Sequence, residues 1–221
     1  QTQFDAPIYG LFAMPDGVGC AVHAGAKLYF RAPDGTQTEL CADMNEAFSQ
    51  SFTMKGVLYL MDGKTYRAVR KSSKNTAWEA VSVSGTAYVP TTTISAAPTG
   101  GGTSYEAVNL LTPKRINTFI GDGTATQFKV DATDLDETAV TAEVNGSAVT
   151  VSAVNRSTGL VTLAAAPANG NGLANVSIAF AKTVSGHADK INKCRFAGLY
   201  GGKNDTRVFL SGNPDEPDCD W

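Results

Sequence analysis

Short apolar runs separated by glycine-containing turns are the feature of this sequence that most limits its fold. Asp62-Gly63 and Asn145-Gly146 each lie between runs in which apolar and polar residues alternate, which is a strong short-range signal for a β-hairpin. Val, Thr, Tyr and Phe are frequent, while long stretches lack the Leu, Glu, Lys and Arg mixtures that favour helices. The sequence therefore predicts an all-β fold.

Residues 1–117 are expected to form a blade-like region of antiparallel strands. The stretches at 24–36 and 55–69 share a small-residue bend, a Leu-Tyr pair and an Asp-Gly turn. Short-strand units that repeat about 40 residues apart are typical of propeller blades, and a plain meander sheet is the alternative. At about 84–117 the chain contains prolines, a triple glycine and many hydroxyl side chains, so we expect an extended connector there.

Residues 118–183 have the clearest strand pattern in the chain. Turn signals recur roughly every 8–12 residues, which is typical of a small β-sandwich or barrel. Asn145-Gly146 fits a type I′ turn in particular. Residues 184–221 have the same pattern of short strands and turns as residues 1–117, with two strands around a Gly-Gly-Lys-Asn-Asp turn at 201–205. We therefore expect a β-sandwich inserted into the blade-like region, because the ends of a domain usually lie close together.

Charge and hydropathy exclude several classes of protein. The 18 basic and 21 acidic residues give a net charge of −3, a poor match to the basic face of a nucleic-acid-binding protein. No apolar run approaches the length of about 18 residues that a membrane helix needs. Gln1 opens a polar segment without the features of a signal peptide. The missing initiator Met and an ending within a motif predict a piece of a longer chain, truncated at its C-terminus.

The cysteines are far apart in the sequence and form no C-x-x-C pair. Their number allows disulfides in more than one connectivity. We expect free thiols in a protein made in a reducing cytoplasm, because a chain of this size builds a core without disulfides. Oxidation of Cys20 with Cys41, or of Cys194 with Cys219, would instead favour a secreted bacterial surface protein.

The sequence supports no catalytic, cofactor or metal site. Cys20 and His23 have a ligand-like spacing, but no second pair of ligands follows. The acidic stretch at 131–137 lacks the order of a calcium loop, and Gly121–Thr124 lacks the lysine and the helix of a phosphate-binding loop. Neither a nucleophile motif nor a glycosidase-like pair of acids stands out. We therefore predict a protein that is not an enzyme and needs no cofactor.

Three aromatic residues are candidate contact residues for a partner: Tyr88, Tyr105 and Trp78. Tyr and Trp are favoured at interfaces because they combine a large apolar surface with a polar group. Tyr88 and Tyr105 lie in the expected connector, which has few core positions and must dock on something. Most other aromatic residues are expected in the cores of the sheets.

Three stretches resemble parts of known virion proteins. Residues 88–115 and 193–221 resemble segments of structural proteins encoded by phages and prophages of Gram-positive gut bacteria, of the tail or head–tail junction type with propeller-like cores. Residues 119–167 resemble a small β-module of phage tail and fibre proteins. This module has a Gly-Asp-Gly-Thr start, a central Val-Asn-Gly and a Thr-Gly-x-Val-Thr-Leu strand before Ala-Pro. The resemblance covers most of 88–221. The preceding residues share only the general pattern of short strands and turns.

The resemblance implies a non-enzymatic virion structural protein that acts through subunit assembly. Its partners would be other virion proteins or further copies of itself, in the virion and, during assembly, in the host bacterial cytoplasm. One alternative is a carbohydrate- or receptor-binding module of a phage appendage or bacterial surface protein, which predicts exposed aromatics with acids and amides in one pocket. The other is a propeller hydrolase, for which Asp62, Asp43 and Glu46 are the acids to test.

Overall fold

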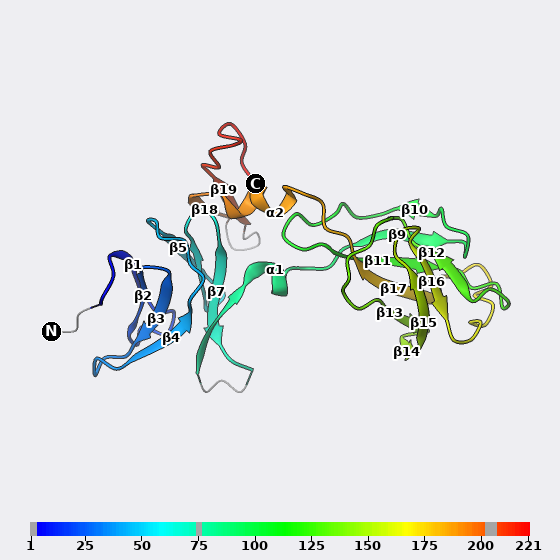
Figure 1. The fold of residues 1–221 in the computed structure, drawn as a ribbon, viewed down its shortest axis with the longest axis horizontal. Helices are drawn as coiled ribbons and strands as arrows, with labels where there is room; N and C mark the ends of the chain where they lie inside the picture. The colour runs from blue at the N-terminus through cyan, green and yellow to red at the C-terminus, as the bar shows by residue number, and fades with distance from the viewer. Residues whose placement is uncertain (1–3, 74–76, 202–206) are drawn as a thin grey trace. The chain divides into compact units, whose positions relative to one another are not determined.

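The protein has an all-β fold, as the sequence predicts. The computed structural model describes residues 4–73, 77–201 and 207–221 (Figure 1). Its helices are short, with four residues in α1 (Val83–Thr86) and six in α2 (His187–Asn192). No helix in these ranges is long and apolar enough to cross a membrane. The chain folds into two compact units, unit 1 with Gln1–Thr86 and Gly186–Trp221, and unit 2 with Ala87–Ser185.

Unit 1 contains two successive four-stranded antiparallel meanders and a two-stranded hairpin. The strands of the first meander are β1 (Ile8–Ala13), β2 (Cys20–Ala24), β3 (Lys27–Arg31) and β4 (Gln37–Cys41). The second meander contains β5 (Gln50–Met54), β6 (Val57–Met61), β7 (Tyr66–Lys71) and β8 (Trp78–Ser82). The hairpin pairs β18 (Phe196–Tyr200) with β19 (Arg207–Ser211), and most of the predicted turn at 201–205 lies outside the described residues.

Both meanders contribute to one core in unit 1. Leu28 of β3 packs in the same cluster as Leu58 and Leu60 of β6. The shared sequence pattern at 24–36 and 55–69 falls on β3, the third strand of its sheet, and on β6, the second strand of its sheet. The repeat is therefore a common turn-and-strand pattern and does not mark equivalent strands of the two meanders.

Unit 2 is β-sandwich-like. A six-stranded sheet has the order β10-β9-β11-β17-β13-β14, and a three-stranded sheet has the order β12-β16-β15. Phe119 of one sheet meets Phe128 of the other edge to face, with ring centroids 5.4 Å apart, inside a single core cluster. The strands are β9 (Thr91–Ala96), β10 (Thr103–Ser104), β11 (Lys114–Phe119), β12 (Gln127–Lys129), β13 (Thr141–Val144), β14 (Ser147–Val149), β15 (Val151–Asn155), β16 (Leu160–Leu163) and β17 (Val176–Ala181).

The boundary expected at residue 118 is corrected to Ala87, because the expected connector at 84–117 contributes strands to unit 2. β9 pairs in parallel with β11 and antiparallel with β10. Thr and Ile suit a strand, and the prolines at 90 and 98 lie outside β9, where their carbonyls still accept backbone hydrogen bonds. The return to unit 1, expected at 184, occurs at Gly186.

The two ends of unit 2 lie beside the same strand. Ile116 of β11 is paired with Thr91 on one side and with Ala179 on the other. Thr91 comes shortly after the chain enters the unit, and Ala179 shortly before the chain leaves it. Entry and exit are therefore adjacent in the sheet.

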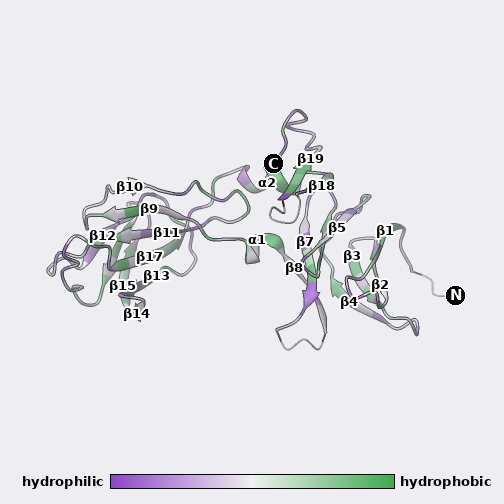
Figure 2. Cartoon of the chain, turned by 180° about the vertical axis from the view of Figure 1, so that it is seen from behind, coloured by the Kyte–Doolittle hydropathy of each residue, from purple (hydrophilic) through white to green (hydrophobic). Residues whose placement is uncertain are grey.

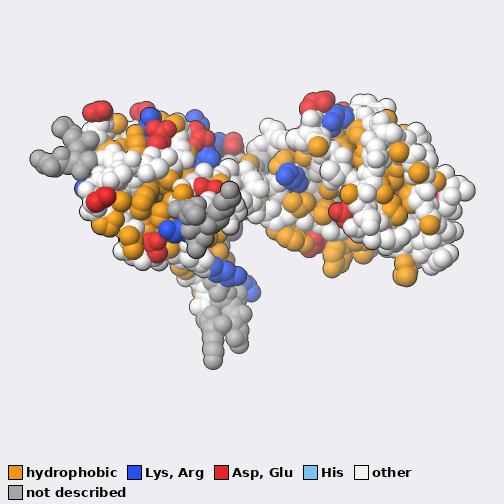
Figure 3. All heavy atoms as spheres, turned by 90° about the horizontal axis from the view of Figure 1, so that it is seen from below, with side chains coloured by type: hydrophobic (Ala, Val, Ile, Leu, Met, Phe, Trp, Pro, Cys, Tyr) orange, Lys and Arg blue, Asp and Glu red, His pale blue; other side chains and the backbone are white. Residues whose placement is uncertain are grey.

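Apolar residues gather in the strands of both units, and some remain at the surface (Figures 2 and 3). The exposed large apolar residues of unit 1 lie on β1, on the loops at Val18 and Phe48, and on the β18–β19 hairpin. The four cysteines are all described and unpaired, as expected.

Candidate functional site

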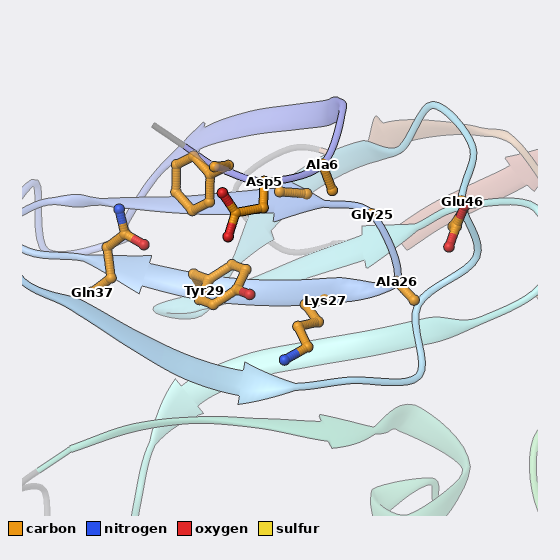
Figure 4. Close-up of a pocket in the computed structure, with 10 residues that line it drawn as sticks. Asp5, Ala6, Gly25, Ala26, Lys27, Tyr29, Gln37 and Glu46 are labelled. Carbon is orange, nitrogen blue, oxygen red and sulfur yellow. The ribbon is translucent and has the colours of Figure 1, made fainter. Parts of the chain in front are cut away.

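A hollow of about 360 Å³ lies beside the first meander of unit 1 (Figure 4). It forms where the residues before β1 pass the bend between β2 and β3. The backbone N–H of Gly25 at this bend donates to the Pro7 carbonyl at 3.0 Å, which holds the two segments together. The residues that line the hollow are Phe4, Asp5, Ala6, Ala24, Gly25, Ala26, Lys27, Tyr29, Gln37 and Glu46.

The lining combines aromatic rings with carboxylates and an amide. The rings of Phe4 and Tyr29 lie 5.3 Å apart and are tilted by 52°. Figure 4 shows Asp5 and Gln37 projecting into the same region as Tyr29. Lys27 Nζ donates to Glu39 Oε2 at 2.7 Å, and this hydrogen bond raises the pKa of Lys27. The hollow thus has the mixture of side chains that the carbohydrate-binding alternative predicts.

The predicted contact residues Tyr88 and Tyr105 are both exposed, in unit 2. The Tyr88 hydroxyl donates to the Glu106 carboxylate, at 2.9 and 3.1 Å from its two oxygens. This hydrogen bond raises the pKa of Tyr88. Glu106 also accepts from the backbone N–H of Thr91 at 2.6 Å, so it anchors Tyr88 to the start of β9. Contact with a partner stays a prediction for both tyrosines.

Trp78, the third predicted contact residue, lies in unit 1 and is less exposed than Tyr88 and Tyr105. It packs against the core of that unit, 6.4 Å from the Phe30 ring. Lys71 Nζ lies 4.1 Å from the centre of the Trp78 ring, a favourable cation–π contact. Much of this indole is therefore used in packing within unit 1.

A face of exposed aromatic side chains on the β18–β19 hairpin was missed by the sequence reasoning. We call Phe196, Tyr200 and Phe209 the hairpin face. The register pairs Gly198 with Phe209 and Tyr200 with Arg207, so these three aromatic side chains project from one side. The Tyr200 and Phe209 rings meet at 78° with centroids 6.0 Å apart. The three residues are 54, 66 and 43% exposed, and on the opposite side Leu210 is buried while Leu199 is 54% exposed.

The alternation in Phe-Ala-Gly-Leu-Tyr at 196–200 was the available signal for the hairpin face. A period of two shows that the first and last residues of this run share a side of the strand. It does not show which side the rest of the unit covers, because that depends on neighbours distant in the sequence.

His23 and Asp62 are buried polar groups inside unit 1. His23 Nδ1 lies 3.1 Å from Ser49 Oγ, and burial lowers the pKa of His23 although the charge of Asp62 opposes the shift. Asp62 accepts hydrogen bonds from three backbone N–H groups and from the Thr65 hydroxyl. These contacts give Asp62 a structural role in closing its turn.

The acids of the hydrolase alternative have separate surroundings. Asp62 is buried, Asp43 forms an ion pair with Arg67, and Glu46 lines the hollow beside β3. Glycoside hydrolysis requires two carboxyl groups that face one scissile bond. The contacts of these three acids do not assemble such a pair.

The weaker metal and phosphate motifs have structural explanations. Cys20 and His23 are three positions apart on β2, so their side chains project from opposite faces of the strand. Asp122 Oδ1 accepts from the backbone N–H groups of Thr124 and Ala125, which makes 121–124 a polar turn. Among the described residues no group of His, Cys, Asp and Glu could hold a metal ion.

Comparison with known proteins gives no family for this chain. No protein-family model, curated protein or solved structure matches it. Its function is therefore argued from the surfaces described above.

Proposed function

We propose that this protein is a non-enzymatic structural component of a phage virion, in the tail or at the head–tail junction, that acts by assembling with other subunits. The hairpin face carries this proposal, because it places three aromatic rings at the surface of one small sheet. Contiguous exposed apolar patches mark interaction sites, and Tyr and other aromatic residues contribute strongly to interfaces.

The edge strand β1 supports the same function, although its Tyr9 carbonyl already accepts a hydrogen bond from the backbone N–H of Ser49 at 3.1 Å. β1 is at the edge of the first sheet and carries the exposed side chains of Ile8 and Leu11. An apolar edge strand can pair with a strand of another chain through its free backbone groups. In this proposal the two meanders act as propeller-like blades, and unit 2 is a module inserted between them and the hairpin.

The virion assignment depends on the resemblance of 88–115, 119–167 and 193–221 to phage structural proteins. The near-neutral charge fits packing between subunits better than contact with packaged DNA. Tyr88 and Tyr105 provide a second exposed aromatic surface, on unit 2.

Light scattering over a dilution series tests the assembly function. We expect the mass of the wild-type chain to rise with concentration. Replacing Tyr200 and Phe209 together by Ser should lower the mass to that of the monomer, because it removes most of the apolar surface of the hairpin face. The matched control is Leu173→Ser, which removes an exposed leucine of unit 2 and should assemble like the wild type. A wild-type chain that is monomeric at every concentration contradicts the proposal.

The hollow beside β3 favours a second candidate function, the binding of a neutral glycan. Aromatic rings with nearby carboxylate and amide groups can pack against a sugar ring and bind its hydroxyls. NMR titration with neutral mono- and disaccharides should shift the resonances of Tyr29 and Gln37, and the double variant Asp5→Ala with Gln37→Ala should lose the shifts. Asp34→Asn, at an exposed turn outside the hollow, is the control. Unchanged spectra with all sugars would exclude this candidate.

A further inference from the structure

Unit 2 has its own hollow, of about 570 Å³, where its two sheets meet. Arg115 comes from β11 of the larger sheet, Lys129 from β12 of the smaller sheet, and Lys182 directly follows β17. Backbone from the glycine-rich loop between β9 and β10 completes the wall. The lining residues are Thr99, Gly100, Gly101, Arg115, Lys129, Val130, Asp131, Ala132, Thr133, Lys182 and Val184.

Positive charge gathers at this hollow although unit 2 is acidic overall. The unit has five basic and seven acidic residues, a net charge of 5 − 7 = −2. Three of the five basic residues line the hollow with a single acid, Asp131, which gives 3 − 1 = +2. The basic residues of unit 2 are Lys114, Arg115, Lys129, Arg156 and Lys182. The local charge is therefore opposite in sign to that of the unit.

Arg115 is held in place before any ligand binds. Its side chain is only 12% exposed, and its guanidinium carbon lies 5.9 Å from the centre of the Phe180 ring. Nη2 donates to the Lys182 carbonyl at 3.4 Å, and Nη1 lies 4.0 Å from Asp131 Oδ1. The planar guanidinium suits two-pronged contact with an oxyanion, and a fixed position lowers the entropic cost of that contact.

Asp131 is held by hydrogen bonds to neighbouring residues of unit 2. Its Oδ2 accepts from the hydroxyls of Thr92 and Thr93, at 2.6 and 2.8 Å. The backbone N–H of Asp131 donates to the buried Asn117 side chain at 2.8 Å. This network fixes the carboxylate, and its distance from Arg115 is too long for a strong ion pair.

Neither lysine of the hollow is paired with a carboxylate in the described part of the chain. Lys182 Nζ donates to the neutral carbonyl of Asp134 at 2.8 Å. The stem of Lys129 lies against Gly100, where an added Cβ would approach Lys129 Cγ to 3.1 Å. Gly100 has a φ of 104°, so a larger residue there would be strained as well as crowded. The glycine-rich loop thus packs against the stem of Lys129 at the wall of the hollow.

We propose that this hollow binds a phosphate group, either as the free anion or as the monoester of a small polyol. The three cations suit a phosphate, which carries close to two negative charges at neutral pH. A single carboxylate carries one negative charge and would leave more of the positive charge of the hollow unbalanced. Arg115 provides paired donors to two phosphate oxygens, and Lys129 and Lys182 provide point charges to the others. The hydroxyls of Thr99 and Thr133 line the same wall and provide polar contacts for the ester group.

Calorimetric titration of the full chain tests the site with three probes at constant ionic strength: inorganic phosphate, glycerol phosphate and acetate. We expect saturable binding of a phosphate probe and much weaker binding of acetate. Tighter binding of glycerol phosphate would assign the site to an ester, and tighter binding of inorganic phosphate would assign it to the free anion.

Variants distinguish this site from general attraction to charge. Lys129→Gln and Lys182→Gln should each weaken phosphate binding about tenfold, because each removes a charge-assisted hydrogen bond. Lys114→Gln is the matched control, since Lys114 adjoins Arg115 on β11 but projects from the other face and lies outside the hollow. The two test lysines are not core residues, so thermal unfolding should show intact variants.

Three results would overturn the proposal. They are no saturable binding of either phosphate probe, acetate binding as tight as phosphate binding, and equal weakening by Lys114→Gln. Because the assembly proposal depends on the hairpin face of unit 1, its failure in light scattering would leave the phosphate titration unaffected.

Discussion

The two units differ in how their phenylalanine side chains are exposed. Unit 2 encloses its three phenylalanines, Phe119, Phe128 and Phe180, in its core, and its exposed aromatic residues are Tyr88 and Tyr105. Unit 1 also has a core, but it leaves the three rings of the hairpin face at the surface. A sheet that exposes such rings gains stability when another surface covers them. Under the proposed assembly function, the exposed rings of unit 1 are the surface that a neighbouring subunit would cover.

The same turn motif shows the contrast at the level of single residues. Asp62 in unit 1 and Asp122 in unit 2 each precede a glycine and accept hydrogen bonds from nearby backbone N–H groups. Asp62 is buried, and Asp122 is exposed. One motif thus closes turns in both units, and its aspartate is buried at Asp62 but exposed at Asp122 and at Asp34 of unit 1.

The largest expected effect comes from opening the core of unit 2. Phe128→Ala should destabilise that unit by about 3–5 kcal/mol, because it removes buried surface and leaves a cavity. Both tryptophans, Trp78 and Trp221, belong to unit 1, so tryptophan fluorescence follows unit 1 and far-UV circular dichroism follows both units. We expect the denaturant midpoint by fluorescence to stay constant while a dichroism transition moves to lower denaturant.

Leu60→Ala is the matched change in the core of unit 1. It should lower the fluorescence midpoint, with a loss of about 2–5 kcal/mol. If Phe128→Ala moved the fluorescence transition equally, the units would unfold together and the comparison between them would fail.

Neutralising the buried turn aspartate should have the next largest effect. Asp62→Asn places an amide where the carboxylate accepts from Asn45, Lys64 and Thr65, and should destabilise unit 1 by about 2 kcal/mol. Asp122→Asn should change stability less, since water replaces lost contacts at an exposed turn. Chemical unfolding of both variants measures the difference, and equal losses would show that burial is not the cause.

The pH dependence of unit 1 should reflect His23. Because burial lowers the pKa of His23 below its ordinary value of 6.5, the unfolded chain binds a proton at a higher pH than the native chain. Stability should therefore fall as the pH drops below 6.5 towards the lowered pKa, with a slope of at most about 1.4 kcal/mol per pH unit.

Fluorescence-detected unfolding between about pH 5 and pH 8 measures this slope. His23→Gln should flatten it. A slope that persists in His23→Gln would assign the pH dependence to other groups.

The smallest expected effect is at the surface of unit 2. The hydrogen bond to Glu106 holds the pKa of Tyr88 above its ordinary value of 10.0. Glu106→Gln should lower the pKa of Tyr88, as followed by NMR of labelled tyrosine rings, while Glu143→Gln on β13 should not. A Tyr88 pKa that is the same in Glu106→Gln would show that the hydrogen bond does not form in solution.

Local features of the fold could be predicted from the sequence, and long-range ones could not. Asn145-Gly146 forms the predicted turn, with positive φ at both residues, because the turn depends on those two residues alone. The parallel pairing of β9 with β11 depends on a strand many residues away, so the local sequence at 91–96 predicts only an extended connector.

The candidate sites show the same limit. Arg115, Lys129 and Lys182 share no motif, and only the pairing of the sheets brings them to one hollow. Phe4 and Tyr29 meet because the chain before β1 folds back across β3. Tyr88 and Tyr105 are exposed, and their contact with a partner stays a prediction.

The adjacent entry and exit of unit 2 affect how the chain responds to cleavage. The chain crosses between the units twice, after Thr86 and after Ser185. A protease that cuts one crossing leaves the two units covalently joined through the other, and the two segments of unit 1, Gln1–Thr86 and Gly186–Trp221, then stay together only by their packing within that unit. Release of unit 2 as a separate piece therefore needs two cuts, one at each crossing.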